Sequence, residues 1–429
     1  MFTVRKTDLK VIIEPLKAPF GFKGGYAREL WQVVVKVESD ANFGIGLGVQ
    51  STLWSDASVY ASNSYCGGNA LMLLVTEYAL KLICGKSFSS PIEALDDIKD
   101  DVYEYAKKIT AKPELRKTFA LNALVAVDNA LWQLAGKESG SEDFLDFVGS
   151  EYRPFLSNRV DKICNIPLVT YNMTMHQVRA LVDEGFFFLK IKIGADPEGD
   201  GSREKMLEWD KQRLCDIHNL VKDIRTPYTE SGHIPYYLDA NGRYDTKERL
   251  CEFLDYAKSI GALERIAIVE EPFDEANKVD VSDLGVRIAA DESAHSCEDV
   301  IERIKLGYGA IALKPIAKTL SETLKILKAA TENSIPCFCA DLTVNPLMVE
   351  FNKNIAARID KFPGVKIGIL ESNGHQNYVN WEQMKTYHPM YGKGKYLNSE
   401  RGIFCLDDEF YDISGAIFKD SDYYCGLFD

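Results

Sequence analysis

The sequence predicts an α/β protein in which an α+β block precedes a barrel of alternating strands and helices. With 429 residues the chain is too long for one ordinary hydrophobic core, so two domains are expected. The N-terminal part of the sequence has the pattern of strands followed by helices. From about Lys162 short apolar runs alternate with helical stretches. Eight such runs favour a (β/α) barrel, although their number alone does not exclude an open doubly wound sheet.

The first block is expected to end near Asn158. Residues 29–38 and 43–49 have the composition of strands joined by a turn. Helical apolar spacing follows over residues 69–82, 91–107 and 118–134. The glycine-rich stretch Gly21–Gly25 predicts a mobile loop or, equally, an ordinary tight turn.

The second block supplies the eight apolar runs. They cover residues 164–171, 186–193, 235–239, 266–270, 286–291, 310–314, 336–341 and 365–371. The helices between them are expected to start near Thr174, Arg203, Thr246, Asp274, Ser296, Ser321 and Asn345. No glycine-rich phosphate-binding motif follows any run, so nucleotide binding has no local support.

The composition indicates which classes of binding partner are unfavourable. The formal net charge is −14, which argues against nucleic acid and anionic membranes and suits a cytoplasmic protein. No run approaches the roughly 18 consecutive apolar residues of a membrane span. The N-terminus carries no signal-like hydrophobic core. The ten scattered cysteines are typical of reduced thiols.

Two lysines interrupt the second apolar run, within the stretch Leu189 to Gly194. Lys190 and Lys192 are two residues apart, so a strand would place both ammonium groups on one face. If the strand is central, this face is buried, and burial makes a lysine a usable base near neutral pH. A solvated edge strand is the commoner explanation of an isolated Lys-x-Lys. The residues at the ends of the other strands must therefore decide between a buried and a solvated pair.

Charged residues occur where the later runs end. They are Asp239, Glu270, Asp291, Lys314, Asp341 and Glu371. In a barrel these carboxyl-terminal strand ends converge on one mouth. A single carboxylate there is usually a helix cap. Three on successive strands repel one another and need a cation, and hard oxygen ligands suit Mg²⁺.

This arrangement suits the removal of a weakly acidic proton next to a carboxylate. The removal creates an enediolate dianion, which a divalent cation and nearby ammonium groups stabilise. One lysine can accept the proton as general base, and a second lysine on the opposite side can return it to the other face.

Together the motifs resemble the enolase superfamily. The barrel is most similar to the muconate-lactonizing enzyme subgroup of the mandelate racemase/muconate lactonizing enzyme type, which also holds dipeptide epimerases. That subgroup carries Lys-x-Lys, Asp-x-Asn, Glu-x-Pro, Asp-Glu-Ser and Lys on its second to sixth strands, and each motif occurs here in order. The resemblance implies a capping domain over residues 1–158, a modified (β/α)7β TIM barrel over 159–375, and a C-terminal segment, 376–429, that packs on the cap.

The resemblance also implies roles for individual residues. Asp239, Glu270 and Asp291 would bind Mg²⁺, with Mn²⁺ as the alternative ion. Lys192 and Lys314 would be the acid/base pair, and Lys190 would assist Lys192 and contact the substrate carboxylate. Asn241 and Glu292 would support these residues, and Asn241 is also a candidate substrate contact. Apart from the resemblance, Asp341 and Glu371 are candidate substrate contacts, with a structural role as the alternative for each. The Gly21–Gly25 loop would cover the mouth and, with the region near Trp54, help to set specificity.

Three departures from the subgroup bear on the reaction. Lys318-Thr319-Leu320 stands where a Gly-Gly pair often follows the sixth-strand lysine. Glu371-Ser372-Asn373 replaces the Asp-x-Asp that holds the ammonium group in many dipeptide epimerases. The seventh strand ends in Asp341 rather than a histidine, which argues against a His/Asp dyad. His295 and His375 are expected near the mouth without a catalytic role.

The preferred function is therefore Mg²⁺-dependent epimerisation or racemisation of a small carboxylate-bearing substrate, by a homo-oligomer. Cycloisomerisation or acid-sugar dehydration shares the same proton abstraction and is the first alternative. A Schiff-base aldolase would also place a lysine inside a barrel, but it leaves the three carboxylates without a role. A non-catalytic barrel would be expected to have lost one of these groups, and none is lost.

Overall fold

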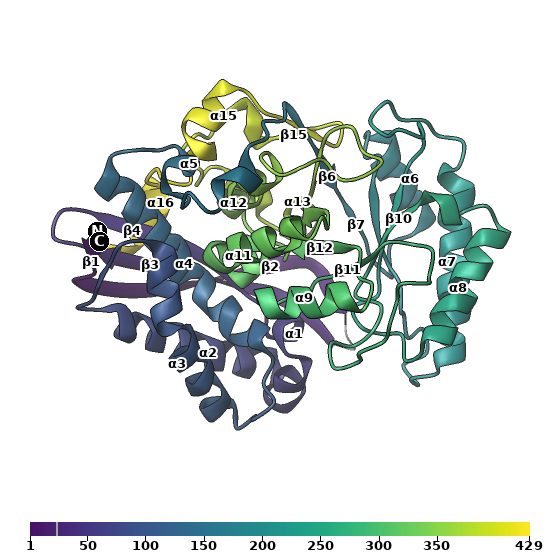
Figure 1. Cartoon of the computed structure of the whole chain (residues 1–429), viewed down its shortest axis with the longest axis horizontal. Coiled ribbons are helices and arrows are strands. Elements are labelled where there is room, and N and C mark those ends of the chain that lie inside the picture. Colours follow the sequence, from purple (N-terminus) through teal and green to yellow (C-terminus); the bar gives the residue numbers. More distant parts are fainter. Residues whose placement is uncertain (23–24) are drawn as a thin grey trace.

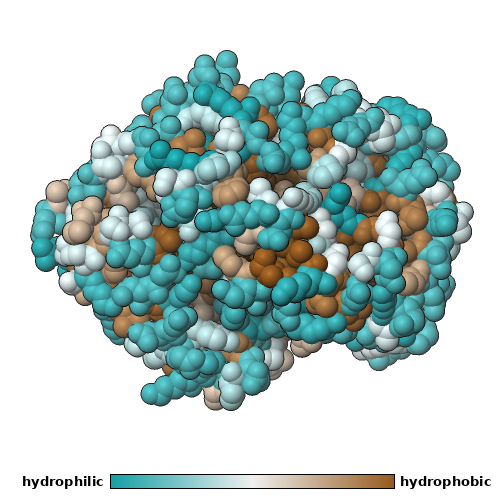
Figure 2. Space-filling model, in the orientation of Figure 1, coloured by the Kyte–Doolittle hydropathy of each residue, from teal (hydrophilic) through white to brown (hydrophobic). Residues whose placement is uncertain are grey.

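The computed structural model describes residues 1–22 and 25–429 (Figure 1). The N-terminal part forms a sheet with helices on one side, coloured purple to blue. The following part, teal to green, is a curled sheet surrounded by helices, and the C-terminal segment in yellow returns across both. The face shown in Figure 2 is largely hydrophilic, in keeping with the net charge of −14.

The N-terminal sheet consists of three antiparallel strands in the order β2-β3-β4. They are β2 (Lys6–Phe22), β3 (Gly25–Glu38) and β4 (Phe43–Gln50). Helix α4 (Lys117–Ser139) packs directly on β4 because glycines leave room for its backbone. A Cβ atom on Gly46 would lie only 2.0 Å from the carbonyl oxygen of Ala126. The close approach of helix and strand therefore depends on this glycine.

The remaining helices of this part pack beside α4. They are α1 (Thr52–Ser55), α2 (Ala57–Ile83), α3 (Pro91–Thr110), α5 (Phe144–Phe147) and the 3-10 turn η1 (Arg153–Leu156). A short pair, β1 (Phe2–Thr3) and β5 (Ser87–Phe88), closes one end. The three predicted helices are present, and the two predicted strands are joined by a third, β2, that the sequence analysis did not anticipate.

Among the described residues one helix, α2, is long and apolar enough to cross a membrane by length and composition. The helix contains no run of 18 consecutive apolar residues, because Asn69, Thr76 and Glu77 interrupt its apolar residues. A core helix of a globular protein meets the same criterion. In this structure α2 is kinked at Ser64 and packs against α3 and α4.

The second sheet contains the eight predicted strands, all parallel. They are β6 (Lys162–Ile166) with β7 (Leu168–Val169), β8 (Leu189–Lys192), β9 (Tyr236–Asp239), β10 (Ile266–Glu270), β11 (Ile288–Ala290), β12 (Ala310–Leu313), β13 (Cys337–Cys339) and β14 (Gly368–Glu371). Each pairs with the next, from β7-β8 to β13-β14, and β14 pairs with β6.

The barrel closes through a single residue. The first predicted run is split at Pro167 into β6, which pairs with the last strand, and β7, which pairs with the second. Because Pro167 joins these two pieces directly, the two ends of the sheet must meet. The fold is therefore a (β/α) barrel with an N-terminal cap, as predicted, and an open doubly wound sheet is excluded.

Helices follow most of the barrel strands at the predicted positions. They are α6 (Met175–Asp183), α7 (Arg203–Val221), α8 (Lys247–Ser259) with η2 (Leu263–Arg265), α9 (Cys297–Lys305), α10 (Pro315–Lys318), α11 (Leu320–Glu332) and α12 (Pro346–Ala356). The helix predicted near Asp274 is absent from the described structure, and residues 274–287 form turns instead. Side chains compete with a helix there, since Asp274 accepts from the Ala276 N–H and Asp280 from the Ser282 N–H.

The C-terminal segment touches both the barrel and the cap. It contains α13 (Gly374–Asn377), α14 (Trp381–Lys385), η3 (Lys395–Leu397), β15 (Ser399–Glu400), β16 (Ile403–Cys405), α15 (Asp408–Asp412), η4 (Ser414–Ala416), α16 (Asp422–Cys425) and η5 (Gly426–Phe428). β16 pairs antiparallel with β6. On the cap side, the Gln133 side chain in α4 donates to the carbonyl of Lys419 at 2.9 Å.

Candidate active site

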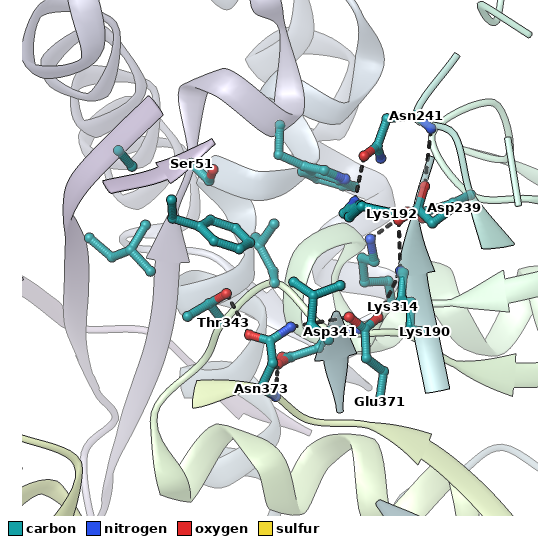
Figure 3. Close-up of a pocket in the computed structure, with 17 residues that line it drawn as sticks. Ser51, Lys190, Lys192, Asp239, Asn241, Lys314, Asp341, Thr343, Glu371 and Asn373 are labelled. Carbon is teal, nitrogen blue, oxygen red and sulfur yellow. Dashed lines mark hydrogen bonds and ion pairs between the residues drawn. The ribbon is translucent and has the colours of Figure 1, made fainter. Parts of the chain in front are cut away.

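The charged residues predicted from the strand ends lie at the carboxyl-terminal mouth of the barrel, and Figure 3 labels six of them: Lys190, Lys192, Asp239, Lys314, Asp341 and Glu371. Strand β8 turns both Lys190 and Lys192 inward, as its two-residue period requires, and both are buried. The other groups lie at or just beyond the ends of their strands. They are Asp239 on β9, Glu270 on β10, Asp291 after β11, Lys314 after β12, Asp341 after β13 and Glu371 on β14.

The strand order places the two predicted acid/base lysines opposite one another. In the ring of eight strands, β8 and β12 are four positions apart in either direction. Lys192 and Lys314 therefore start from opposite walls of the barrel. Asp239, Glu270 and Asp291 occupy the arc between them on one side, and Asp341 and Glu371 occupy the other arc.

Lys190 is held by three carboxylates from three strands. Its Nζ lies 3.0 Å from Asp239 Oδ2, 2.8 Å from Glu270 Oε2 and 2.9 Å from Glu371 Oε2. Burial acts to lower the pKa of Lys190, but these three charges raise it well above its ordinary value. Lys190 is therefore an ammonium ion that neutralises the floor of the site.

The Asp239 side of the site contains Lys192. The Lys192 Nζ lies 2.6 Å from Asp239 Oδ2 and donates to Asn241 Oδ1. The amide of Asn241 in turn donates to Glu292 Oε1 at 3.1 Å. Burial acts to raise the pKa of Asp239, but Lys190 and Lys192 lower it below its ordinary range. Asn241 and Glu292 thus stand behind Lys192, the supporting arrangement that the resemblance implies.

On the opposite wall Asp291 lies between two lysines. Lys314 contacts Asp291 Oδ2, and Lys318 lies 3.1 Å from Asp291 Oδ1. Burial acts to raise the pKa of Asp291, but both ammonium groups lower it. Burial likewise acts to lower the pKa of Lys314, which Asp291 and Glu270 raise. The Lys314 ammonium also lies 4.6 Å from the ring centre of Trp54, which the cap contributes.

On the second arc, the acidic residues Asp341 and Glu371 are linked by hydrogen bonds. Glu371 Oε2 accepts from the Asp341 N–H at 2.9 Å, and Asp341 Oδ2 accepts from the Asn373 N–H at 2.8 Å. The Asn373 side chain also donates to Glu371 Oε1 at 3.1 Å. Burial and the charge of Glu371 raise the pKa of Asp341 to about 7. Asn373 therefore stands where the second aspartate of the Asp-x-Asp pattern would be, and it orients Glu371.

The cap covers this mouth. Phe20 and Ala27, from the β2-β3 hairpin, line the cavity together with Leu30, Trp54 and the barrel residues. Of the predicted Gly21–Gly25 loop, Lys23 and Gly24 lie outside the described residues. The enclosed cavity measures about 40 Å³, room for a few water molecules. Among the described residues this volume is smaller than a substrate of peptide or sugar-acid size.

The two histidines expected near the mouth lie elsewhere in the described structure and do not line the cavity. His295 contacts Glu275 Oε2 and Asp299 Oδ2, each at 3.2 Å. His375 stacks on Phe186 with the ring centres 5.9 Å apart. Neither geometry supports a direct part in proton transfer at the cavity.

The donor chemistry of the three carboxylates fits a hard divalent cation. Asp239, Glu270 and Asp291 are buried, and Glu270 Oε1 has no hydrogen-bond partner among the described residues. Within those same residues, however, no three His, Cys, Asp or Glu side chains form a ready ligand cluster. The ammonium groups of Lys190 and Lys314 lie against their oxygens instead, so binding a cation requires these lysines to shift.

Two residues that were not predicted from the sequence as part of the site, Tyr237 and Lys318, also contact its charged groups. The Tyr237 hydroxyl donates to Glu270 Oε2 at 2.6 Å, and its ring lies 4.6 Å below the Lys190 ammonium. Tyr237 precedes Asp239 by two residues on β9, so the strand period alone places it inside. Lys318 lies four residues after Lys314, one helical turn away, and that spacing was the available signal.

The comparisons with known proteins agree with this fold. Residues 173–382 match the family model described as enolase C-terminal domain-like. No curated protein sequence matches the chain. A mandelate racemase/muconate lactonizing enzyme from Roseiflexus sp. is similar over 96% of this chain and 97% of that chain, with a TM-score of 0.65 and 16% identity.

Two epimerase structures are similar as well. The L-Ala-D/L-Glu epimerase from Bacillus subtilis, in a substrate-liganded complex, matches over 94% of this chain and 96% of that chain, with a TM-score of 0.63 and 17% identity. The dipeptide epimerase from Enterococcus faecalis V583, complexed with Mg and L-Leu-L-Tyr, matches over 86% and 90%, with a TM-score of 0.61 and 19% identity.

At these identities the solved structures establish the fold, and the matched family model covers the barrel from β8 to β14 but not β6 and β7. Residues 173–382 thus match the enolase C-terminal domain-like family, and the chain as a whole has the fold of the solved mandelate racemase/muconate lactonizing enzymes.

Proposed function

We propose that the chain is an isomerase that removes a proton α to a carboxylate and returns it to the opposite face, an epimerase or racemase. The observation that carries this proposal is the opposition of Lys192 and Lys314, four strands apart in a ring of eight. A substrate carbon between them can lose its proton to one lysine and receive a proton from the other.

The two lysines have different surroundings, which suits opposite roles. Because the pKa of Lys314 is raised by Asp291, its side chain carries the proton and can donate it. Lys192, once it has given up a proton and is a neutral amine, accepts the α-proton from the other face, oriented by Asp239 and Asn241. In the reverse direction the roles exchange, as microscopic reversibility requires.

Asp239, Glu270 and Asp291 are the residues that would hold Mg²⁺ or, as the alternative, Mn²⁺. When bound, the cation supplies positive charge against the substrate carboxylate. Lys190 places further positive charge at the floor of the cavity. The structures of two dipeptide epimerases similar to this chain are complexed with Mg and a dipeptide, which supports the choice of ion.

The substrate would be a small carboxylate whose other end lies along the arc of Asp341 and Glu371. These buried acidic groups favour a substrate that offers hydrogen-bond donors there, and the apolar side chains of Phe20 and Leu30 would cover it. The net charge of −14 is in keeping with this proposal of a cytoplasmic enzyme that acts on small molecules rather than on nucleic acid or membranes.

The test is proton NMR in D₂O with Mg²⁺ and pools of dipeptides, N-acyl amino acids and sugar acids. Loss of an α-proton signal, with deuterium in both stereoisomers, is expected for the wild-type protein. Lys192→Ala should abolish exchange from one epimer and Lys314→Ala exchange from the other, since each lysine serves one face. Lys81→Ala, on the exposed side of α2, is the matched control and should change neither.

The other outcomes identify the alternatives. Exchange that persists in EDTA or in both lysine variants would refute the mechanism. Exchange without inversion, followed by loss of water or ring closure, would indicate a dehydratase or cycloisomerase. Trapping of substrate on a lysine by borohydride would indicate a Schiff-base aldolase instead.

A further inference from the structure

Lys318 is a buried lysine that the proposed chemistry does not use. It is the last residue of α10, one turn after Lys314, and it is fully buried. A buried ammonium group is costly unless it is paired and hydrogen-bonded. The groups that contact the Lys318 ammonium therefore indicate its structural role.

In the described part of the chain, the Lys318 ammonium contacts the segment that follows β11. It lies 3.1 Å from Asp291 Oδ1 and donates to the backbone carbonyls of Asp291 and Ala294, the latter at 3.1 Å. These three acceptors match the three N–H groups of a lysine. Lys318 thus ties both the backbone and the carboxylate of Asp291 to α10.

The backbone next to Lys318 carries strain that fixes where α10 ends. Thr319 has φ +72° and ψ 151°, a conformation that a β-branched residue rarely adopts. Its hydroxyl accepts from the Glu322 N–H at 3.1 Å and caps α11. The strained residue lets α10 stop immediately after Lys318 and lets α11 begin in a new direction.

The contacts of Lys318 concern one wall of the site. Asp291 binds Lys318 through Oδ1 and Lys314 through Oδ2, so its carboxylate lies between the two ammonium groups. Lys192, on the opposite wall, contacts Asp239 and Asn241 instead. A change at Lys318 should therefore reach Lys314 through a single carboxylate and should leave the Lys192 side largely unaffected.

We propose that Lys318 is a positioning residue that fixes the Asp291 carboxylate beside Lys314, and so sets where the Lys314 ammonium stands, also after the shift that binding a cation requires, for proton transfer on one face of the substrate. This inference rests on the proposed function for its kinetic consequence. Its structural part, the hold on Asp291, can be measured without substrate.

The variant that tests it is Lys318→Met, which keeps most of the side-chain length and removes the charge. The matched control is Lys353→Met in α12. Lys353 is also fully buried, and its Nζ contacts Glu350 Oε1 at 2.8 Å and the carbonyl of Tyr396 at 2.7 Å. Both variants remove one buried ammonium group that pairs with one carboxylate, so general destabilisation affects both.

The kinetic measurement follows deuterium exchange separately for each epimer, with the Lys314-dependent epimer identified as the one that Lys314→Ala no longer exchanges. Lys318→Met should slow exchange of that epimer by about 100-fold, the cost of a misplaced reacting group, and should change the other epimer by less than about threefold. Lys353→Met should leave the ratio of the two rates unchanged. Equal slowing of both epimers by Lys318→Met would overturn the inference.

The second measurement is Mn²⁺ binding by calorimetry, without substrate. Removing an ammonium group that competes for Asp291 should tighten Mn²⁺ binding by about tenfold in Lys318→Met and leave Lys353→Met unchanged. Unchanged Mn²⁺ affinity would refute the hold on Asp291. If the wild-type protein exchanges no α-proton, the proposed function fails, and the Mn²⁺ result still decides the role of Lys318. If Lys318→Met does not fold, Lys318→Gln serves instead, with the same expected results.

Discussion

Asp128 joins the cap to the barrel, and its replacement by asparagine leads to a quantitative prediction. It lies in α4 and is fully buried. Its Oδ2 accepts from the Ser321 N–H of α11 at 3.0 Å, and its Oδ1 accepts from the Ser321 hydroxyl. Trp132 Nε1 donates to the same hydroxyl at 3.0 Å. One carboxylate thus secures the helix of the cap that lies closest to the barrel.

Burial raises the pKa of Asp128 to about 6 from its ordinary value of 3.8, against the hydrogen bonds from Ser321, which lower it. The folded protein therefore binds this proton more tightly than the unfolded chain does. The resulting stabilisation is fully present below the unfolded pKa and is lost as the pH rises through about 6. The whole effect corresponds to about 3 kcal/mol, and about 1.4 kcal/mol of it lies between pH 5 and pH 8.

Asparagine has no proton to lose in this range, so Asp128→Asn removes the pH dependence. The assay is urea unfolding at pH 5, 6, 7 and 8, followed by circular dichroism and tryptophan fluorescence. The free energy of unfolding of the wild type minus that of Asp128→Asn should fall by about 1.4 kcal/mol from pH 5 to pH 8. Asp223→Asn, at an exposed position, is the control and should show no such trend.

A difference that stays constant with pH would refute the reasoning, because it would mean that Asp128 has the same proton affinity in the folded and unfolded chain. A difference that rises with pH would be stronger evidence against it. Such a rise would mean that the hydrogen bonds from Ser321 stabilise the charged carboxylate by more than burial destabilises it.

Three further predictions concern the site and the cap. Tyr237→Phe removes the hydroxyl that donates to Glu270 at 2.6 Å and should lower the free energy of unfolding by about 1.5–3 kcal/mol; an unchanged urea midpoint would contradict this. Gly46→Ala places a methyl group 2.0 Å from the Ala126 carbonyl oxygen and should cost at least about 1–3 kcal/mol, and a midpoint equal to that of the wild type would show that α4 can shift freely. Phe20→Ala should raise KM about tenfold with little change in kcat, since Phe20 covers the cavity; a fall in kcat alone would place it in the chemistry instead.

Local pattern was sufficient to predict the strands and the positions of the charged side chains. A strand alternates its faces every two residues, so Lys190 and Lys192 had to share one face wherever the strand lay. Parallel strands in a barrel end at one mouth, so Asp239, Glu270 and Asp291 had to converge. These rules act over a few residues, so the local pattern predicted the barrel strands and the ring of ionisable groups, whereas the pairing of β6 and β7 on either side of Pro167 decided that the sheet closes into a barrel.

The pairing of those groups was decided only by the tertiary structure. Lys190 meets Glu371, which is 181 residues away, and no short-range rule selects that carboxylate from the others. Lys318 contacts Asp291, which precedes it by 27 residues, and Thr319 next to it has a φ of +72° that no residue pattern marks. The missing helix after Phe273 was decided by side chains that bind the backbone locally, in competition with the helix. Burial affects the charge of each group only after distant strands have brought its partners within contact distance. The sequence therefore determined which ionisable residues form the site, and the fold determined which of them contact one another.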